Sequence, residues 1–122
     1  MSAVCAALAG DPVLAAHYAD FRAKAEGALD PALVALVRQA VAQVHGIDSA
    51  PIDESALDAG TRAAIAYARR MPFEHTAITD AEAAAMVAHL GEPGFGAVSV
   101  VTALADAECR AALVDLPGLA AG

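Results

Sequence analysis

The stretch LDPALVALVRQAVAQVHGIDSA, residues 29–50, decides the predicted fold of this 122-residue chain. Asp30 caps a helix, and Pro31 suits the first helical turn, where its missing N–H costs no hydrogen bond. Apolar residues then recur at helical spacing, at Leu33, Leu36, Val37, Ala40, Val41 and Val44. Gly46 is typical of the residue that ends a helix. The stretch therefore predicts an amphipathic helix that carries His45 at its end and continues into a polar bend.

Two further helical segments are predicted before this helix. Residues 1–10 indicate a short helix or arm, and they lack the basic start and the apolar length of a signal peptide. Asp11 and Pro12 repeat the capping pair and open a helix that runs to about Gly27. One face of that helix is predicted to be buried because apolar residues follow each other at steps of four and three, at Leu14, Tyr18, Phe21, Ala25 and Ala28.

Two helices are predicted after the polar bend. Asp58 caps the first, which continues to Met71 and stops at Pro72, since proline lacks the N–H that a helix interior uses. Thr79 and Glu82 form a capping box that predicts a second helix over residues 80–90. That helix is predicted to end at the helix breakers Gly91, Pro93 and Gly94.

The last predicted helix runs from about Phe95 to Leu116, and Pro117 stops it, which leaves residues 117–122 as a short frayed tail. Its apolar stripe consists of Val98, Val101, Ala105, Cys109, Ala112 and Leu116. No segment alternates polar and apolar residues in the manner of a strand. The sequence therefore predicts an all-α protein, a compact bundle of about five to six helices that forms a single domain over residues 1–122.

Composition limits the partners of this domain. The net charge of −8 disfavours contact with phosphate backbones and anionic membranes, so we expect neither a nucleic-acid partner nor a membrane. No run approaches the roughly 18 uninterrupted apolar residues of a membrane span. Alanine dominates the apolar residues and contributes little burial per side chain. Association would recruit more apolar area, so we expect a homo-oligomer.

The stretch around His45 resembles the carboxymuconolactone decarboxylase and AhpD-like family. That family runs a helix of this pattern into Asn-Gly-Cys-x-x-Cys, with a His one turn later. In this chain the matching residues are His45 to Ala50, so the two family cysteines fall on Ile47 and Ala50. The later family His falls on Glu54, and the acidic residue that redox members carry upstream falls on Ala35.

A second resemblance lies downstream, where LDAGTRAAIAYARRM, residues 57–71, and ITDAEAAAMVAHLG, residues 78–91, look like the later helix pair of the family. The resemblance implies an AhpD-like fold and an oligomer, with the redox cysteines lost. It therefore implies a divergent member that does not exchange disulfides and has a non-redox binding or structural role, with a small molecule as a possible ligand.

Three functional hypotheses remain open. The first is that binding or structural association. The second is a non-redox enzyme that acts on a small organic acid or lactone by acid–base chemistry, with His45 as the proton-transfer group and Asp48 or Glu54 as its carboxylate partner. The third is a subunit that completes the site of another chain. In the second hypothesis the predicted catalytic residues are His45, Asp48 and Glu54.

Cysteine and histidine spacing adds no cofactor or metal site to these hypotheses. Cys5 and Cys109 lie far apart and fit no CxxC motif, so we expect reduced thiols in a cytoplasmic protein. Cys109 falls on the buried stripe of the last helix, where burial is expected to raise its pKa. The four histidines fit no compact metal motif; they are His17, His45, His75 and His89.

Overall fold

The computed structural model describes residues 2–121, and within that range every regular element is a helix. The elements are α1 (Ala3–Ala7), α2 (Pro12–Gly27), α3 (Pro31–Val44), α4 (Ala59–Glu74), the 3-10 turn η1 (His75–Ala77), α5 (Asp80–Leu113) and α6 (Leu116–Ala121). The all-α prediction and the expected number of helices are confirmed.

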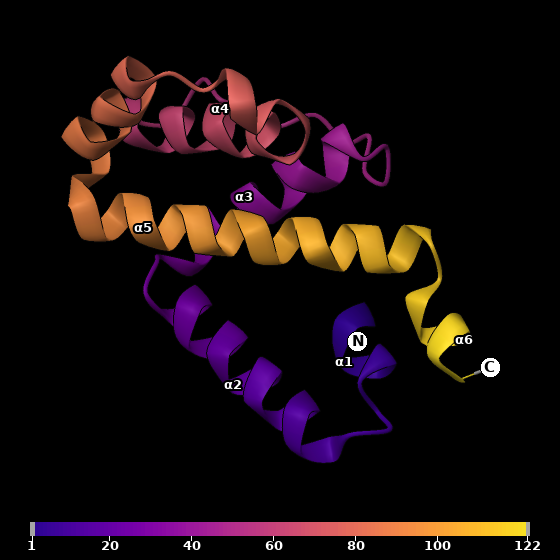
Figure 1. The fold of residues 1–122 in the computed structure, drawn as a ribbon. Helices are drawn as coiled ribbons and strands as arrows, with labels where there is room; N and C mark the ends of the chain where they lie inside the picture. Colours follow the sequence, from indigo (N-terminus) through magenta and orange to yellow (C-terminus); the bar gives the residue numbers. More distant parts are fainter. Residues whose placement is uncertain (1, 122) are drawn as a thin grey trace.

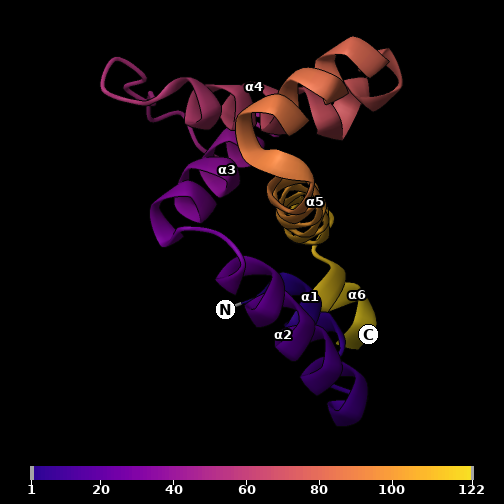
Figure 2. The ribbon, with the colours of Figure 1, turned by 90° about the vertical axis from the view of Figure 1, so that its left-hand side faces the viewer.

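Helix α5 is the central element, and the other helices cover two of its sides (Figure 1). Helices α3 and α4 pack on one side, whereas α1, α2 and α6 lie on the other. The view along α5 in Figure 2 shows the same division. Segments from both ends of the chain meet on the second side, because α1 packs against α6.

The hydrophobic core lies between α3, α4 and α5. Val37 and Val41 of α3, Ile65 of α4 and Val101 of α5 are fully or almost fully buried there. Each helix presents these residues at steps of three or four, which is why one face of each packs inward. The apolar stripe predicted for α3 is therefore confirmed.

Both predicted ends of α3 are confirmed as well. The Asp30 carboxylate accepts a hydrogen bond from the N–H of Ala32 at 2.8 Å, which satisfies one of the unpaired donors of the first turn. Gly46 has φ +73°, a left-handed conformation that a side chain would strain. These two ends place His45 at the C-terminal cap of α3.

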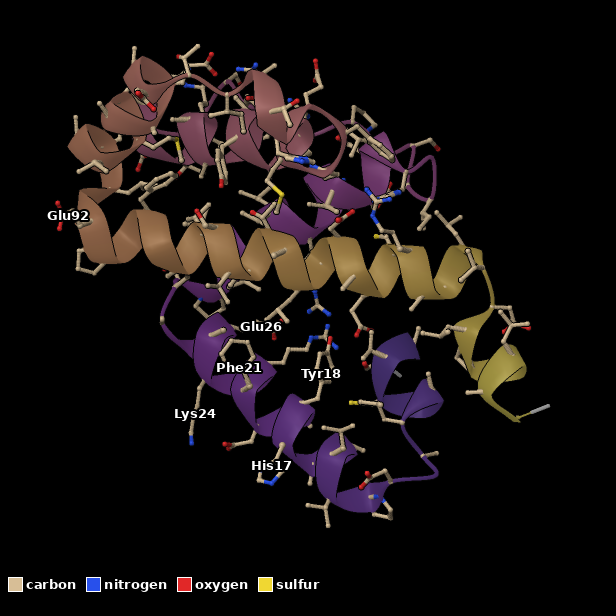
Figure 3. All side chains as sticks on the ribbon, in the orientation of Figure 1. His17, Tyr18, Phe21, Lys24, Glu26 and Glu92 are labelled. Atoms are coloured by element: carbon tan, nitrogen blue, oxygen red, sulfur yellow. The ribbon has the colours of Figure 1, made fainter. Side chains whose placement is uncertain are left out.

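The buried face predicted for α2 is wrong at Leu14, Phe21 and Ala28, while Tyr18 and Ala25 are partly buried. Leu14 and Phe21 are 49% and 54% exposed, and α2 has no fully buried residue. In Figure 3 His17 points away from α5, whereas Tyr18 points toward the side on which α1 lies. Two polar side chains of α2, Tyr18 and Arg22, reach Glu108 of α5.

The predicted stop of α4 at Pro72 is also wrong, since α4 continues to Glu74 and then tightens into η1. A proline inside a helix removes one N–H donor but keeps a helical φ. Here Pro72 is buried, and its carbonyl accepts a hydrogen bond from Arg110 Nη2 at 2.8 Å. That bond from α5 stabilises the last turn of α4.

The helix break predicted at Gly91, Pro93 and Gly94 is confined to one residue, Gly91. Gly91 has φ +75° and ψ 164°, which kinks α5, and the helix resumes directly after it. Pro93 then lies in the first turn of the second part of α5, where its missing N–H is tolerated. The two helices predicted here are therefore the two parts of one kinked helix.

The prediction for the C-terminal end is corrected too. Helix α5 ends at Leu113 rather than at Leu116, and residues 116–121 form α6 rather than a frayed tail, while residue 122 lies outside the described residues. Asp115 turns the chain with φ 50°, and Pro117 then lies in the first turn of α6. Proline begins a helix here instead of ending one.

Helix α5 is long and apolar enough to cross a membrane by length and composition alone. Helix α5 packs along both α3 and α4, but only 17% of its apolar window is buried.

Candidate binding site around His45

His45 forms a buried pair with a carboxylate that lies far from it in the sequence. Its Nε2 lies 2.6 Å from Oδ1 of Asp106 on α5, and the His45 side chain is only 3% exposed. A carboxylate accepts hydrogen bonds and donates none, so we assign the N–H of the ring to Nε2. In that tautomer Nδ1 is left as a hydrogen-bond acceptor.

Arg110 fixes the carboxylate of this pair. Its Nε lies 3.0 Å from each oxygen of Asp106, one helical turn earlier, and its Nη2 donates to Pro72. The Arg110 guanidinium stacks over the Phe73 ring at 5.0 Å, and the Phe73 ring meets the His45 ring edge-on at 4.9 Å. These contacts restrict the orientation of both members of the pair.

An apolar cleft of about 600 Å³ opens beside the pair. His45, Phe73 and Arg110 contribute its polar and aromatic part. The rest of its wall is aliphatic and comes from α1, α5, α6 and the turn before α6, namely Val4, Ala107, Ala111, Leu113, Val114 and Leu116. A mainly apolar cavity with a few convergent polar groups is the usual form of a small-molecule site.

The structure does not bring the three predicted catalytic residues together. The carboxylate of Asp48 accepts the N–H of Ala50 at 2.8 Å within its own bend, and Glu54 pairs with Arg69 at 3.2 Å. Within residues 2–121, no hydrogen bond or ion pair joins either carboxylate to His45.

Sequence reasoning selected His45 and missed its actual partner, Asp106. The only signal in the sequence is that Asp106 and Arg110 stand four residues apart on a helix, a spacing that lets the two side chains meet. Nothing in that spacing points to His45, because the contact depends on how α3 packs against α5.

The two cysteines lie on different helices, Cys5 on α1 and Cys109 on α5. Cys5 and Cys109 are both free thiols, so the described chain has no disulfide between them. Burial raises the pKa of Cys109, and the nearby carboxylates of Asp106 and Glu108 raise it further. This direction matches the sequence prediction and keeps the thiol protonated at neutral pH, where only the thiolate would be an effective nucleophile.

Within residues 2–121 no three His, Cys, Asp or Glu side chains gather in a way that would hold a metal ion. His17, His75 and His89 lie exposed at the surface, away from the buried His45.

No protein-family model, curated protein or solved structure matches this chain. The likeness to the AhpD-like family stays a prediction from residues 29–50 and from the two stretches at 57–71 and 78–91.

Proposed function

We propose that this protein binds a small, mainly apolar organic molecule that carries a hydroxyl group, and that the ligand lies in the His45 cleft. The observation that carries the proposal is the buried His45 side chain, paired with Asp106, in the wall of a mainly aliphatic cavity of about 600 Å³ that Phe73 and Arg110 also line. The aliphatic wall favours an apolar ligand body, because its contact with the wall removes apolar surface from water.

The polar groups determine where the ligand hydroxyl lies. Nδ1 of His45 can accept a hydrogen bond in the assigned tautomer, so it suits a hydroxyl donor. A pair of this kind orients a ligand more than it adds affinity, since the hydrogen bond with the ligand replaces one with water. The role is a binding role without redox chemistry, as the sequence also predicts.

Titration with p-cresol, followed by amide and imidazole NMR shifts, tests this proposal. The Ala107→Phe variant fills the cleft without altering His45, Asp106 or Arg110, and Ala103→Phe is its matched control one turn earlier on the same exposed face of α5. We expect p-cresol to shift the His45 ring signals in the wild type and the control, and to leave them unchanged in Ala107→Phe. Equal shifts in all three proteins would overturn the proposal.

The same pair supports a second candidate, an acid–base enzyme that acts on a small lactone or organic acid. A His–carboxylate pair holds the imidazole in one tautomer, as a general base requires. In this version His45 remains the base, while Asp106 replaces the predicted partners Asp48 and Glu54. Turnover of a set of small lactones, followed by proton NMR, should fall about 100-fold or more in His45→Gln. An unchanged rate in that variant excludes this function.

We also propose that the chain is a divergent AhpD-like protein that associates with a second copy of itself through α2. Support comes from the large apolar side chains that α2 leaves exposed, Val13, Leu14 and Phe21. A compact fold normally buries such a group, and a second copy would bury it. Sedimentation analysis should show a dimer or larger assembly that Phe21→Ser weakens, whereas a monomer at all concentrations contradicts the association.

A further inference from the structure

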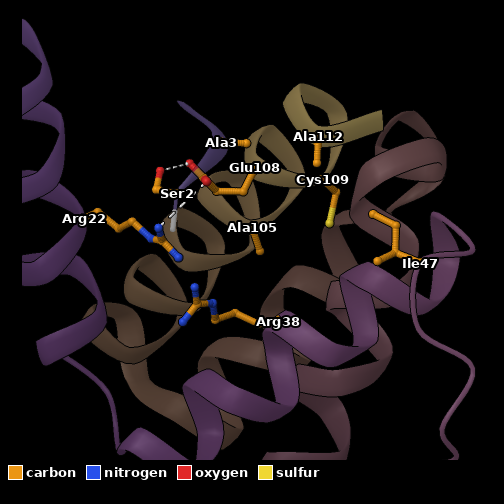
Figure 4. A pocket seen from close by; sticks show the side chains of 9 residues that line it. All are labelled: Ser2, Ala3, Arg22, Arg38, Ile47, Ala105, Glu108, Cys109 and Ala112. Carbon is orange, nitrogen blue, oxygen red and sulfur yellow. Dashed lines mark hydrogen bonds and ion pairs between the residues drawn. The ribbon is translucent and has the colours of Figure 1, made fainter. Parts of the chain in front are cut away.

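A second cleft, of about 450 Å³, lies on another face of the C-terminal half of α5 (Figure 4). Unlike the His45 cleft, it contains two arginines, Arg22 of α2 and Arg38 of α3. One wall is aliphatic and comprises Ile47, Ala105 and Ala112. The Glu108 carboxylate lines the cleft near α1.

The two guanidinium groups converge although their helices are separate elements. Figure 4 shows both extending into the cleft from α2 and α3. Glu26 holds them together, because its Oε1 lies 3.3 Å from Arg22 Nε and 3.5 Å from Arg38 Nη1. One carboxylate is thus shared between two positive charges.

Most donors of this arginine pair remain available. A guanidinium has five N–H donors. Among residues 2–121, Arg22 donates one hydrogen bond, to Glu26, and Arg38 donates none, since its contact with Glu26 is an ion pair only. The Arg22 side chain is 16% exposed, so its unmet donors are partly removed from water.

Glu108 does not occupy these donors. Its Oε2 accepts hydrogen bonds from Ser2 Oγ at 2.8 Å and from the Tyr18 hydroxyl at 2.5 Å, while its Oε1 accepts the N–H of Val4 at 3.5 Å. The nearest guanidinium nitrogen of Arg22 lies 3.9 Å from Oε1. Glu108 therefore forms an ion pair with Arg22 but accepts no hydrogen bond from it, and Arg38 pairs only with Glu26 among the described residues, so guanidinium donors remain for another anion.

We propose that this cleft binds a small carboxylate with a short aliphatic tail, independently of the His45 site. The carboxylate lies between Arg22 and Arg38, since planar guanidinium groups match the two oxygens of a carboxylate. The tail lies along the aliphatic wall formed by Ile47, Ala105 and Ala112. A cavity of this volume lies within the range of known small-molecule sites.

Isothermal titration with hexanoate at low ionic strength and neutral pH tests this inference, with hexan-1-ol as the uncharged probe of the same chain length. We expect the wild type to bind hexanoate and not hexan-1-ol at the same concentrations. Arg38→Gln should weaken hexanoate binding about tenfold or more, because a charge-assisted hydrogen bond is lost. Arg38→Lys keeps the positive charge but lacks the planar guanidinium group. Its affinity for hexanoate should lie between those of the wild type and Arg38→Gln.

The matched control is Arg62→Gln, which removes the same charge from an exposed position on α4 outside the cleft and should leave hexanoate binding unchanged. Arg38 is 46% exposed and pairs only with Glu26 in the described chain, so circular dichroism should show that Arg38→Gln folds.

Four results would overturn the inference. The first is equal binding of hexanoate by Arg38→Gln and the wild type, and the second is equal binding of hexan-1-ol and hexanoate. The third is loss of hexanoate binding in Ala107→Phe but not in Arg38→Gln, which would place the ligand in the His45 cleft. Inorganic phosphate is the competing anion, and a tighter, Arg38-dependent affinity for phosphate would overturn the assignment to a carboxylate.

Discussion

The two sides of α5 are held by different forces. On the side of α3 and α4, buried aliphatic residues such as Val37, Ile65 and Val101 fill the interface. On the side of α1 and α2, the closest contacts are hydrogen bonds to one carboxylate, Glu108. The first side depends on the area removed from water, and the second depends on a charge state and on hydrogen-bond geometry.

This difference also explains why both candidate clefts lie along the C-terminal half of α5. Helix α1 contributes Ala3 and its N-cap residue Ser2 to the arginine cleft and Val4 to the His45 cleft, so it lies between them. A segment held mainly by hydrogen bonds opens at a lower free energy than a packed core does. Access to either cleft should therefore depend on Glu108 more than on the core.

The largest effect is expected from Ile65→Ala in the apolar interface. Ile65 is completely buried between α3, α4 and α5. Removing its side chain leaves a cavity and should lower the free energy of unfolding by about 2 to 5 kcal/mol. Urea unfolding followed by circular dichroism measures the change. A loss below about 1 kcal/mol would mean that this side is less tightly packed than its burial indicates.

The next effect is expected from Glu108→Gln on the polar side. The amide keeps the shape of the side chain but removes the negative charge to which Ser2 and Tyr18 donate hydrogen bonds. The free energy of unfolding should fall by about 1.5 to 3 kcal/mol. Unlike Ile65→Ala, this change should increase amide hydrogen exchange in α1 and α2 more than in α3 and α4. Glu92→Gln, an exposed change on the same helix, is the control. Uniform loss of protection across all helices would contradict the division into two sides.

Lowering the pH should destabilise the two sides of α5 to different extents in the wild-type protein. Burial alone would raise the pKa of Glu108, but hydrogen bonds from Tyr18, Ser2 and Val4, together with the charge of Arg22, lower it below its ordinary 4.5. The stabilisation is therefore complete above pH 4.5 and is lost as the pH falls through the lower pKa of the folded state. Residue-resolved NMR between pH 7 and pH 3 should show α1 and α2 loosening before the core.

The control for this acid effect is Glu108→Gln, which has no carboxylate to protonate at that position. Its α1 and α2 should already be loosened at pH 7 and should show no further loosening as the pH falls through the pKa of Glu108. The Asp58 cap of α4 also has a lowered pKa, through hydrogen bonds from Thr61, so acid weakens the start of α4 as well. Loosening that begins throughout α3 and α5 in the wild type would show that the core, and not Glu108, governs the response to acid.

The sequence predicts one side of α5 much better than the other. The α3 helix, its Asp30 cap and the turn at Gly46 follow from local chemistry, and the structure confirms them. The exposed face of α2 was not predictable, since Leu14 and Phe21 have the spacing of a buried face, and only tertiary packing decides whether a partner covers it.

The same limit applies to the candidate site. His45 was recognisable because a helix end and a polar bend present it, while Asp106 was not, since the two residues meet only when α3 packs against α5. Pro72 and Pro117 illustrate the reverse error. The rule that proline ends a helix predicted helix ends at both residues. In the structure a hydrogen bond from Arg110 stabilises the helix at Pro72, whereas Pro117 lies in the first turn of α6.

The smallest effect is expected from Tyr18→Phe. The change removes one hydrogen bond to Glu108 but leaves those from Ser2 and Val4, so the free energy of unfolding should fall by about 1 kcal/mol. It should also raise the pKa of Glu108, because the Tyr18 hydroxyl stabilises the charged carboxylate. The acid loosening of α1 and α2 should then begin at higher pH than in the wild type. If stability falls but the pH of loosening does not move, Tyr18 acts through packing, and the polar side of α5 is less dependent on the charge of Glu108 than its hydrogen bonds indicate.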